Sequence, residues 1–239
     1  DLFDYMRENA LRQEAPLAVR MRPQSLEEIA GQAHILGKDK LLYRAVKADA
    51  VGSMMLYGPP GCGKTTIAEV ISRETQSDFC RLNATTAGKK EMEEVIQRAK
   101  ENFGRGRRTT LFVDEIHRFH KGQQDFLLPY VEDGTVALIG ATTENPFFEV
   151  NAALLSRSRI FELKPLAAAD IAALLRRAMA DKERGYGNWR AELTEEACAF
   201  LADAAAGDAR TALNALELGM KTTAPESDGC ISITLSVAE

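Results

Sequence analysis

The residues with the clearest chemical potential form a glycine-rich segment, GPPGCGKTT, at positions 58–66. It follows an apolar run, Met54–Tyr57, and precedes a segment with apolar residues at helical spacing. Glycines let backbone N–H groups wrap a polyphosphate, and the start of a helix adds partial positive charge. In this pattern Lys64 reaches the β and γ phosphates and Thr65 offers its hydroxyl to Mg²⁺. The predicted phosphate-binding residues are Gly58, Pro59, Pro60, Gly61, Cys62, Gly63, Lys64, Thr65 and Thr66.

Two adjacent carboxylates follow about fifty residues later, in the segment LFVDE at positions 111–115. They stand where an apolar strand is expected to end, which is the edge where parallel α/β sheets bind ligands. Asp114 suits an Mg²⁺ ligand, and Glu115 suits a general base that polarises a water molecule. The alternative is that both residues only cap the next helix.

Three more polar residues fit the same chemistry, each with a simpler alternative. Thr143 lies in GATTENP at positions 140–146, where its hydroxyl suits the γ-phosphate or the attacking water, or belongs to an ordinary turn. Arg157, in SRSR at 156–159, suits an arginine finger for a neighbouring subunit's ATP, or a solvated basic turn. Arg210 follows Asp208 in the first turn of a predicted helix, where a cation opposes the helix dipole. This placement suggests that Arg210 meets an anion such as an ATP phosphate; the alternative is an ordinary exposed arginine.

The histidines and cysteines do not form a convincing metal set. His117 and His120 are three residues apart and could share a helix face, but no third ligand is evident. The four cysteines have no paired spacing, which is typical of reduced thiols rather than of disulfides or a zinc site. Mg²⁺ is therefore the metal that the sequence predicts.

Strands and helices alternate around these motifs. Apolar runs at 54–57, 78–82, 110–113, 136–139 and 160–163 alternate with helical stretches, which predicts an α/β fold with a parallel sheet flanked by helices. After Pro165 the pattern contains helices only, at 167–180, 194–204 and 208–221, which predicts a small all-helical lid domain. We therefore divide the chain into an arm and start of the core (1–52), a nucleotide-binding core (53–165) and a lid (166–239).

Composition sets broad limits on function. The 239 residues carry a net charge of −5, so any contact with nucleic acid requires a local basic strip. No apolar run approaches the roughly 18 to 20 residues of a membrane helix, which predicts a soluble protein. Together with the reduced thiols, this favours a cytoplasmic location. The first residue is Asp1 rather than methionine, so we expect the sequence to be a fragment.

The ordered motifs resemble those of the AAA+ P-loop ATPases. In this resemblance the segment 58–66 would be Walker A, and the pair Asp114 and Glu115 would be Walker B. Thr143 would be sensor 1, Arg157 the arginine finger and Arg210 sensor 2. Within that superfamily the chain resembles the bacterial replication-associated recombination protein A family, also called MgsA, which is similar to eukaryotic Werner-helicase-interacting ATPases. HRFHKGQQDFLLPYVEDG is the most specific segment; PLAVRMRPQSLEEIAGQAHILG, LNATTAGKKEM and GDARTALNALE also carry the resemblance.

The resemblance implies a DNA-dependent ATPase that uses ATP and Mg²⁺ at stalled replication forks and in recombination and repair. It implies action at forked, gapped or single-strand/double-strand junctions, a homotetramer built through a carboxyl-terminal domain, contact with single-strand binding protein, and a nucleoid-associated location. The chain ends where the oligomerisation domain would begin, so we expect that domain to be absent. The family pattern would make Asn83 a polar switch on Glu115 and would place Pro23, Ile29 and Ala30 near adenine.

Small departures from the family pattern remove no catalytic group. Cys62 replaces a commoner threonine, His120 a frequent asparagine, and Thr211 a frequent arginine. Cys62 adds a thiol inside the phosphate-binding loop.

Other functions remain open at this point. Clamp-loader subunits and Holliday-junction motors share most motifs, and an ATP-gated protein-binding scaffold with little turnover would retain all of them. A protein unfoldase would carry an aromatic pore loop, whereas the corresponding stretch here, TTAGKK at 85–90, contains lysines. Lys89 and Lys90 suit a phosphate backbone, so we take them as DNA-binding candidates; the alternative is a solvated loop.

Overall fold

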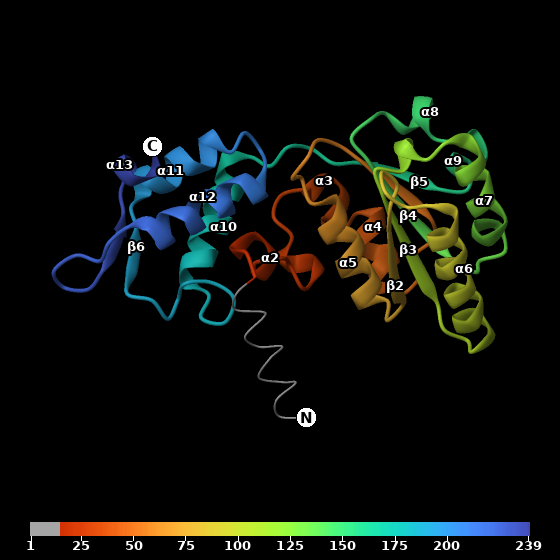
Figure 1. The fold of residues 1–239 in the computed structure, drawn as a ribbon, viewed down its shortest axis with the longest axis horizontal. Helices are drawn as coiled ribbons and strands as arrows, with labels where there is room; N and C mark the ends of the chain where they lie inside the picture. The colour runs from red at the N-terminus through yellow and green to blue at the C-terminus, as the bar shows by residue number, and fades with distance from the viewer. Residues whose placement is uncertain (1–14) are drawn as a thin grey trace. The chain divides into compact units, whose positions relative to one another are not determined.

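The computed structural model describes residues 15–239, which form two compact units (Figure 1). One unit is Gln24–Lys164, and the other joins the segment ending at Pro23 to Pro165–Glu239. The chain therefore passes between the units twice, at 23–24 and at 164–165. The first is the sheet unit and the second is the lid unit.

The sheet unit contains five parallel strands in the order β2-β3-β4-β1-β5. Their bounds are β1 Met54–Tyr57, β2 Asp78–Asn83, β3 Thr109–Asp114, β4 Ala137–Thr142 and β5 Arg159–Glu162. The three central strands are almost entirely buried, which explains why they read as continuous apolar runs. The predicted parallel α/β sheet is confirmed.

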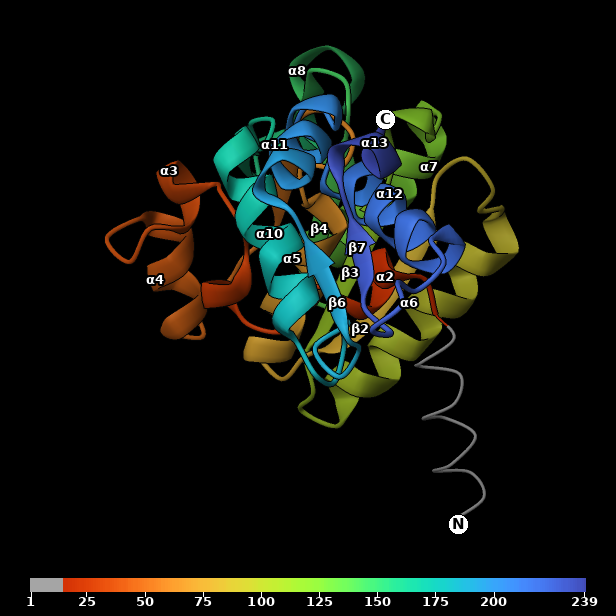
Figure 2. The same ribbon diagram turned by 90° about the vertical axis from the view of Figure 1, so that its left-hand side faces the viewer.

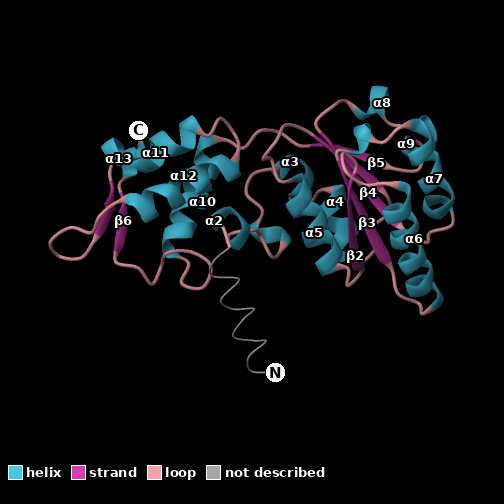
Figure 3. Cartoon of the chain, in the orientation of Figure 1, coloured by secondary structure: helices cyan, strands magenta, loops and turns pink. Residues whose placement is uncertain are grey.

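Helices cover both faces of this sheet (Figures 1 and 3). One apolar core, on the side of α5, includes Leu42, Ile67, Phe112 and Ile139; the other, on the side of α6 and α7, includes Met92, Leu111 and Leu127. The helices of the unit are η1 Leu26–Glu28, α3 Ala33–Leu36, α4 Leu41–Lys47, α5 Lys64–Glu74, α6 Lys89–Gly104, η2 Ile116–Arg118, α7 Lys121–Glu132, α8 Pro146–Glu149 and α9 Ala152–Leu155. Leu26, Leu36, Leu42 and Val46 are buried in the first core, so this core extends well before Ser53.

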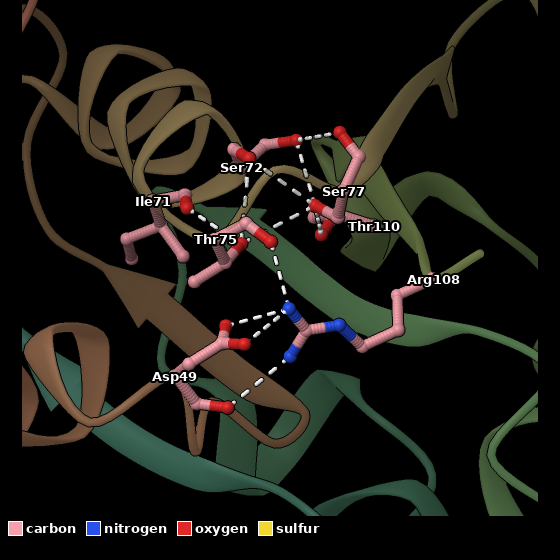
Figure 4. A network of polar contacts seen from close by, with 7 residues as sticks. All are labelled: Asp49, Ile71, Ser72, Thr75, Ser77, Arg108 and Thr110. Atoms are coloured by element: carbon pink, nitrogen blue, oxygen red, sulfur yellow. Dashed lines mark hydrogen bonds and ion pairs between the residues drawn. The ribbon is translucent and has the colours of Figure 1, made fainter. Parts of the chain in front are cut away.

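A polar network ties the elements together at the amino-terminal end of the strands (Figure 4). The Arg108 guanidinium donates to both carboxylate oxygens of Asp49 at 2.6 Å and to the Thr75 carbonyl at 2.8 Å. The hydroxyls of Ser77 and Thr110 lie 2.6 Å apart, linking the start of β2 to β3. This network fixes the end of the sheet opposite the glycine-rich segment.

The lid unit is mainly helical, as predicted, with an additional small sheet. Its helices are α2 Leu17–Arg20, α10 Ala168–Ala180, α11 Glu195–Ala204, α12 Ala209–Thr222 and α13 Leu235–Ala238. Two strands that the sequence did not predict, β6 Ala191–Leu193 and β7 Ile231–Ile233, pair in parallel (Figure 2). Each has only three residues, too few to show alternation, so the expectation of helices alone in this unit is corrected.

The amino-terminal arm contains regular structure. Within the segment 16–31, α2 and η1 form on either side of Pro23. The Leu17 N–H donates to the buried Glu217 carboxylate of α12 at 2.9 Å, which binds α2 to the lid unit. Between residues 15 and 239, no helix has both the length and the apolar character needed to cross a membrane.

Candidate nucleotide-binding site

The glycine-rich segment forms a tight loop between β1 and α5. Its fit requires Gly58, because a Cβ there would lie 2.4 Å from the Leu163 carbonyl oxygen. Gly63 precedes α5 with φ 101°, a conformation that favours glycine, and no side chain caps the helix. The first N–H groups of α5 are thus not taken by a capping side chain. The loop fits a polyphosphate, which such groups bind.

Lys64 is almost completely buried and points back at its own loop. Its ammonium group donates to the carbonyl oxygens of Gly58 at 2.7 Å and Pro59 at 2.8 Å. A buried ammonium needs such partners because burial without them is costly. A phosphate would offer the same cation a stronger, charged acceptor.

The acidic pair lies at the end of β3. Asp114 forms an ion pair with Arg81 of β2, at 2.9 Å, and Glu115 follows with φ 53°. The Glu115 side chain, at the N-cap of η2, makes no capping hydrogen bond. A carboxylate at Asp114 and a hydroxyl at Thr65 are oxygen donors of the kind that Mg²⁺ prefers, so these two residues fit the metal.

Glu115 has two neighbours that restrain its carboxylate. Its Oε2 lies 3.5 Å from the Thr143 hydroxyl, which follows β4, and 3.3 Å from His117 Nδ1. The His117 side chain is only 8% exposed and also contacts the Thr142 hydroxyl at 2.8 Å. The structure thus brings Glu115 and Thr143 together and adds His117, which we had considered only as a metal ligand.

His120 has a separate role from His117. Its ring nitrogen accepts from the Gln123 N–H at 3.3 Å, and the Gln123 side chain returns a bond to the His120 N–H at 3.1 Å. This capping box starts α7. Among residues 15–239, no three His, Cys, Asp or Glu side chains gather as a metal site would require.

Asn83 ends β2, beside Asp114 in the strand register. Its amide oxygen accepts from the N–H and hydroxyl of Thr85, at 3.0 and 2.7 Å. The residue is therefore at the correct edge, but its oxygen holds the next turn rather than Glu115. The proposed switch on Glu115 stays a prediction.

The arm contributes to the phosphate-binding loop through a residue that we did not predict. Ile29 packs against the core that contains Cys62 and Leu163, and Ala30 is half-buried beside it in sequence. The buried Gln32 side chain donates to the carbonyl oxygens of Cys62 at 3.3 Å and Lys164 at 2.7 Å, and accepts from the Lys164 N–H at 3.1 Å. Gln32 joins the arm, the loop and the end of the sheet unit.

The remaining predicted residues lie on exposed surfaces. Arg157 follows α9 and pairs with Glu132 of α7, while also donating to the Ala153 carbonyl at 2.9 Å. Lys89 and Lys90 open α6 and are 84% and 92% exposed, each near a glutamate one turn along. Arg210 is exposed in the first turn of α12, capped by Asp208, and belongs to the lid unit as Pro23 does.

Gln32 and Arg81 are residues that sequence reasoning missed, and His117 was considered only as a metal ligand. Their motifs, GQ within the arm, CRLN before the turn and DEIH at the end of β3, stood beside predicted site residues. Their position in the sequence could have identified them, because each lies within four residues of a predicted site residue. Their partners could not be read from the sequence because they lie up to 132 residues away.

This fold and site define the class of protein. The chain is an AAA+ P-loop ATPase, because it combines a phosphate-binding loop after β1, an acidic pair at the end of β3, a hydroxyl after β4 and a helical lid. Residues 54–166 match the model of the ATPase family associated with various cellular activities (AAA), and residues 187–239 match that of an AAA C-terminal domain. Among solved structures, the RuvB Holliday junction branch migration motor of Thermotoga maritima superposes with a TM-score of 0.71 at 25% identity, covering 92% of this chain and 71% of that chain.

More similar relatives narrow the assignment. The chain is 54% identical to replication-associated recombination protein A of Escherichia coli K12, over 85% of this chain and 45% of the relative. It is 48% identical to the Bacillus subtilis protein of that name, over 94% of this chain and 52% of the relative. The ATPase WRNIP1 of Dictyostelium discoideum is 41% identical over 89% of this chain and 24% of its own length.

The chain therefore belongs to the AAA family of ATPases and, within it, to the homologues of replication-associated recombination protein A. It spans about half the length of these bacterial relatives.

Proposed function

We propose that this chain is the ATPase core of a DNA-dependent enzyme that acts at stalled replication forks and in recombination and repair, hydrolysing ATP where subunits meet. The observation that carries the proposal is the convergence of Lys64, Asp114 and Glu115 at one edge of the sheet. Lys64 follows β1, and Asp114 and Glu115 lie at the end of β3. These two strands flank β4, which is followed by Thr143. The names of the relatives support the biological setting.

The chain's own groups would divide the work on ATP. The loop N–H groups and Lys64 would bind the phosphates, and Thr65 and Asp114 would hold Mg²⁺, which neutralises phosphate charge when bound. Glu115, restrained by Thr143 and His117, would accept hydrogen bonding from the attacking water and orient it. Arg210 would meet phosphate from the lid unit.

Arg157 would act on a neighbouring subunit's ATP. Arg157 follows the short helix α9 and pairs with Glu132 of α7, and its side chain remains 41% exposed at the surface of the sheet unit. An arginine finger stabilises negative charge as it develops on the transferred phosphoryl group. Assembly would then control turnover, and we propose a homotetramer for the longer protein.

Lys89 and Lys90 would contact the DNA backbone. Both ammonium groups are highly exposed, and their glutamate neighbours lie at 3.6 and 3.8 Å, contacts that cost little to break in water. Because they open α6 directly after the turn that follows Asn83, DNA binding there would act close to Asp114. We extend the proposal to forked, gapped or junction DNA, to single-strand binding protein as a partner, and to a nucleoid-associated location.

The test is the steady-state ATPase rate without DNA, with duplex DNA and with forked DNA, at low and high salt. The proposal predicts stimulation that is greatest with forked DNA and that falls as salt rises, because phosphate contacts release counterions. Lys89→Gln/Lys90→Gln should lose most of the stimulation and keep the basal rate, whereas Lys121→Gln should retain both. A rate indifferent to every DNA would contradict the proposal.

A further inference from the structure

The ion pair between Arg81 and Asp114 occupies the carboxylate that the proposed function assigns to Mg²⁺. Arg81 Nη2 lies 2.9 Å from Asp114 Oδ2, and these side chains are 44% and 20% exposed. Strand register places Arg81 opposite Phe112, two residues before Asp114 on β3. The guanidinium also lies 5.8 Å from the centre of the Phe112 ring. Arg81 thus reaches from β2 to Asp114 at the end of the neighbouring strand β3.

A cavity that Arg81 also lines offers this side chain a second position. Its volume is about 270 Å³, and it lies between β2 and α6, lined by Arg81, Glu94, Arg98, Phe79, Cys80 and Val95. Arg98 is committed to Asp78 at 2.6 Å. Glu94 supplies the carboxylate in the lining of this cavity, and its ion-pair partner, Lys90, lies 3.8 Å away, so Glu94 can accept a new cation.

We propose that Arg81 is a switch on the metal-binding carboxylate: it pairs with Asp114 when the metal is absent and turns to Glu94 when Mg²⁺ binds. This inference rests on the proposed function. The guanidinium and Mg²⁺ compete for one carboxylate, so Arg81 raises the Mg²⁺ concentration that nucleotide binding needs. Arg81 is a positioning residue, since it acts on the site through Asp114.

The same arrangement connects the metal site to the candidate DNA surface. Glu94 pairs with Lys90, and Lys90 is one of the two exposed lysines that open α6. A DNA phosphate that takes Lys90 would leave Glu94 without a cation. Arg81 would then favour Glu94, and Asp114 would be released to Mg²⁺. DNA binding would therefore lower the Mg²⁺ requirement.

The experiment is a Mg²⁺ titration of the binding of a fluorescent ATP analogue to the whole chain, without DNA, for the parent and four variants. Arg81→Met should lower the half-saturating Mg²⁺ concentration about two- to fivefold, the range expected for a half-exposed ion pair. Glu94→Gln should raise it. Arg98→Met is the matched control, because it removes a neighbouring arginine of the same cavity and should leave the value unchanged.

The double variant separates a switch from a general effect of charge. If Arg81 moves between two carboxylates, Glu94→Gln has no further effect in the Arg81→Met background; if the charges act independently, the two effects add. Additive effects, or a Mg²⁺ requirement that Arg81→Met leaves unchanged or raises, would overturn the switch while nucleotide binding stands. A parent chain that binds no nucleotide at any Mg²⁺ concentration would instead overturn the proposed function, and the switch with it.

Discussion

At the scale of single residues, the charged groups of the site all have protein partners. Lys64 donates to loop carbonyls, Asp114 pairs with Arg81, and Glu115 lies between Thr143 and His117. A phosphate of ATP would be a stronger partner for Lys64 than the loop carbonyls, and Mg²⁺ would be a stronger partner for Asp114 than Arg81. Binding would thus exchange existing contacts rather than order free side chains, which reduces the entropic cost.

Lys64→Ala tests the phosphate contact. Loss of a charged hydrogen-bond donor should weaken nucleotide binding by about tenfold or more. Titration with a fluorescent nucleotide measures this, with Lys121→Ala as a control for loss of an exposed lysine. Equal affinities for Lys64→Ala and the parent would exclude Lys64 from the phosphate site.

His117→Gln tests the role of the histidine beside Glu115. Because His117 contacts the carboxylate but no predicted phosphate ligand, kcat should fall about tenfold through misplacement of the base, with nucleotide affinity unchanged. His120→Asn is the control, since asparagine also caps helices and kcat should hold. Loss of binding together with kcat would mean that His117 only supports the fold.

At the scale of elements, the strands of the central sheet could be predicted because burial on both faces gave continuous apolar runs. The carboxyl ends of β1, β3 and β4 then predicted where the candidate site residues would lie, which are Lys64, Asp114, Glu115 and Thr143. The pair β6 and β7 could not be predicted, because its partners are short and about forty residues apart. The contacts of Gln32, Arg81 and Arg157 depend on tertiary packing, which sequence spacing does not encode.

Arg108 illustrates how an exposed cation holds elements together. Although Arg105 and Arg107 lie close to it in the sequence, the Arg108 guanidinium is bound to Asp49 and Thr75 (Figure 4). Arg108→Met should lower the free energy of unfolding of the sheet unit by about 1 kcal/mol, because hydrogen bonds to a charged group are lost in a partly solvated setting. Urea unfolding measures the change, and Arg107→Met should not reproduce it.

Glu217 provides an element-scale prediction in the lid unit. Burial opposes its ionisation, but bonds from Lys221 and the Leu17 N–H outweigh burial and lower its pKa below the ordinary 4.5. A lowered pKa stabilises the folded state above pH 4.5, and the contribution disappears as pH falls through the folded-state pKa. Glu217→Gln should therefore unfold more easily near neutral pH, by about 1 kcal/mol.

Thermal unfolding at neutral and acidic pH measures this contribution. The gap between the parent and Glu217→Gln should close as pH falls below about 4.5. Glu192→Gln, on the exposed side of β6, is the control. A gap that persists at acidic pH would show that the charge of Glu217 does not stabilise α2 against α12.

At the scale of the whole molecule, the groups proposed to act on ATP belong to more than one unit. The sheet unit contains the loop, the acids and Thr143, whereas Arg210 belongs to the lid unit. Arg157 is proposed to serve a different subunit. Turnover should therefore depend on assembly as well as on the local site.

Subunit mixing tests whether Arg157 acts between subunits. Arg157→Ala and Glu115→Gln should each be inactive alone, but their mixture should regain activity, because one supplies an intact site and the other an intact finger. The ATPase rate is measured in mixtures that cross-linking shows to contain both variants. Mixed assemblies without any regained activity would contradict action in trans.

The most direct test of the central claim compares the parent with Glu115→Gln in two assays: binding of a fluorescent ATP analogue and steady-state phosphate release with Mg²⁺ and forked DNA. We expect unchanged nucleotide affinity and a turnover rate reduced by about a hundredfold or more, because a general base is lost. A Glu115→Gln variant that releases phosphate as fast as the parent would contradict the assignment of this edge of the sheet as the site of ATP hydrolysis.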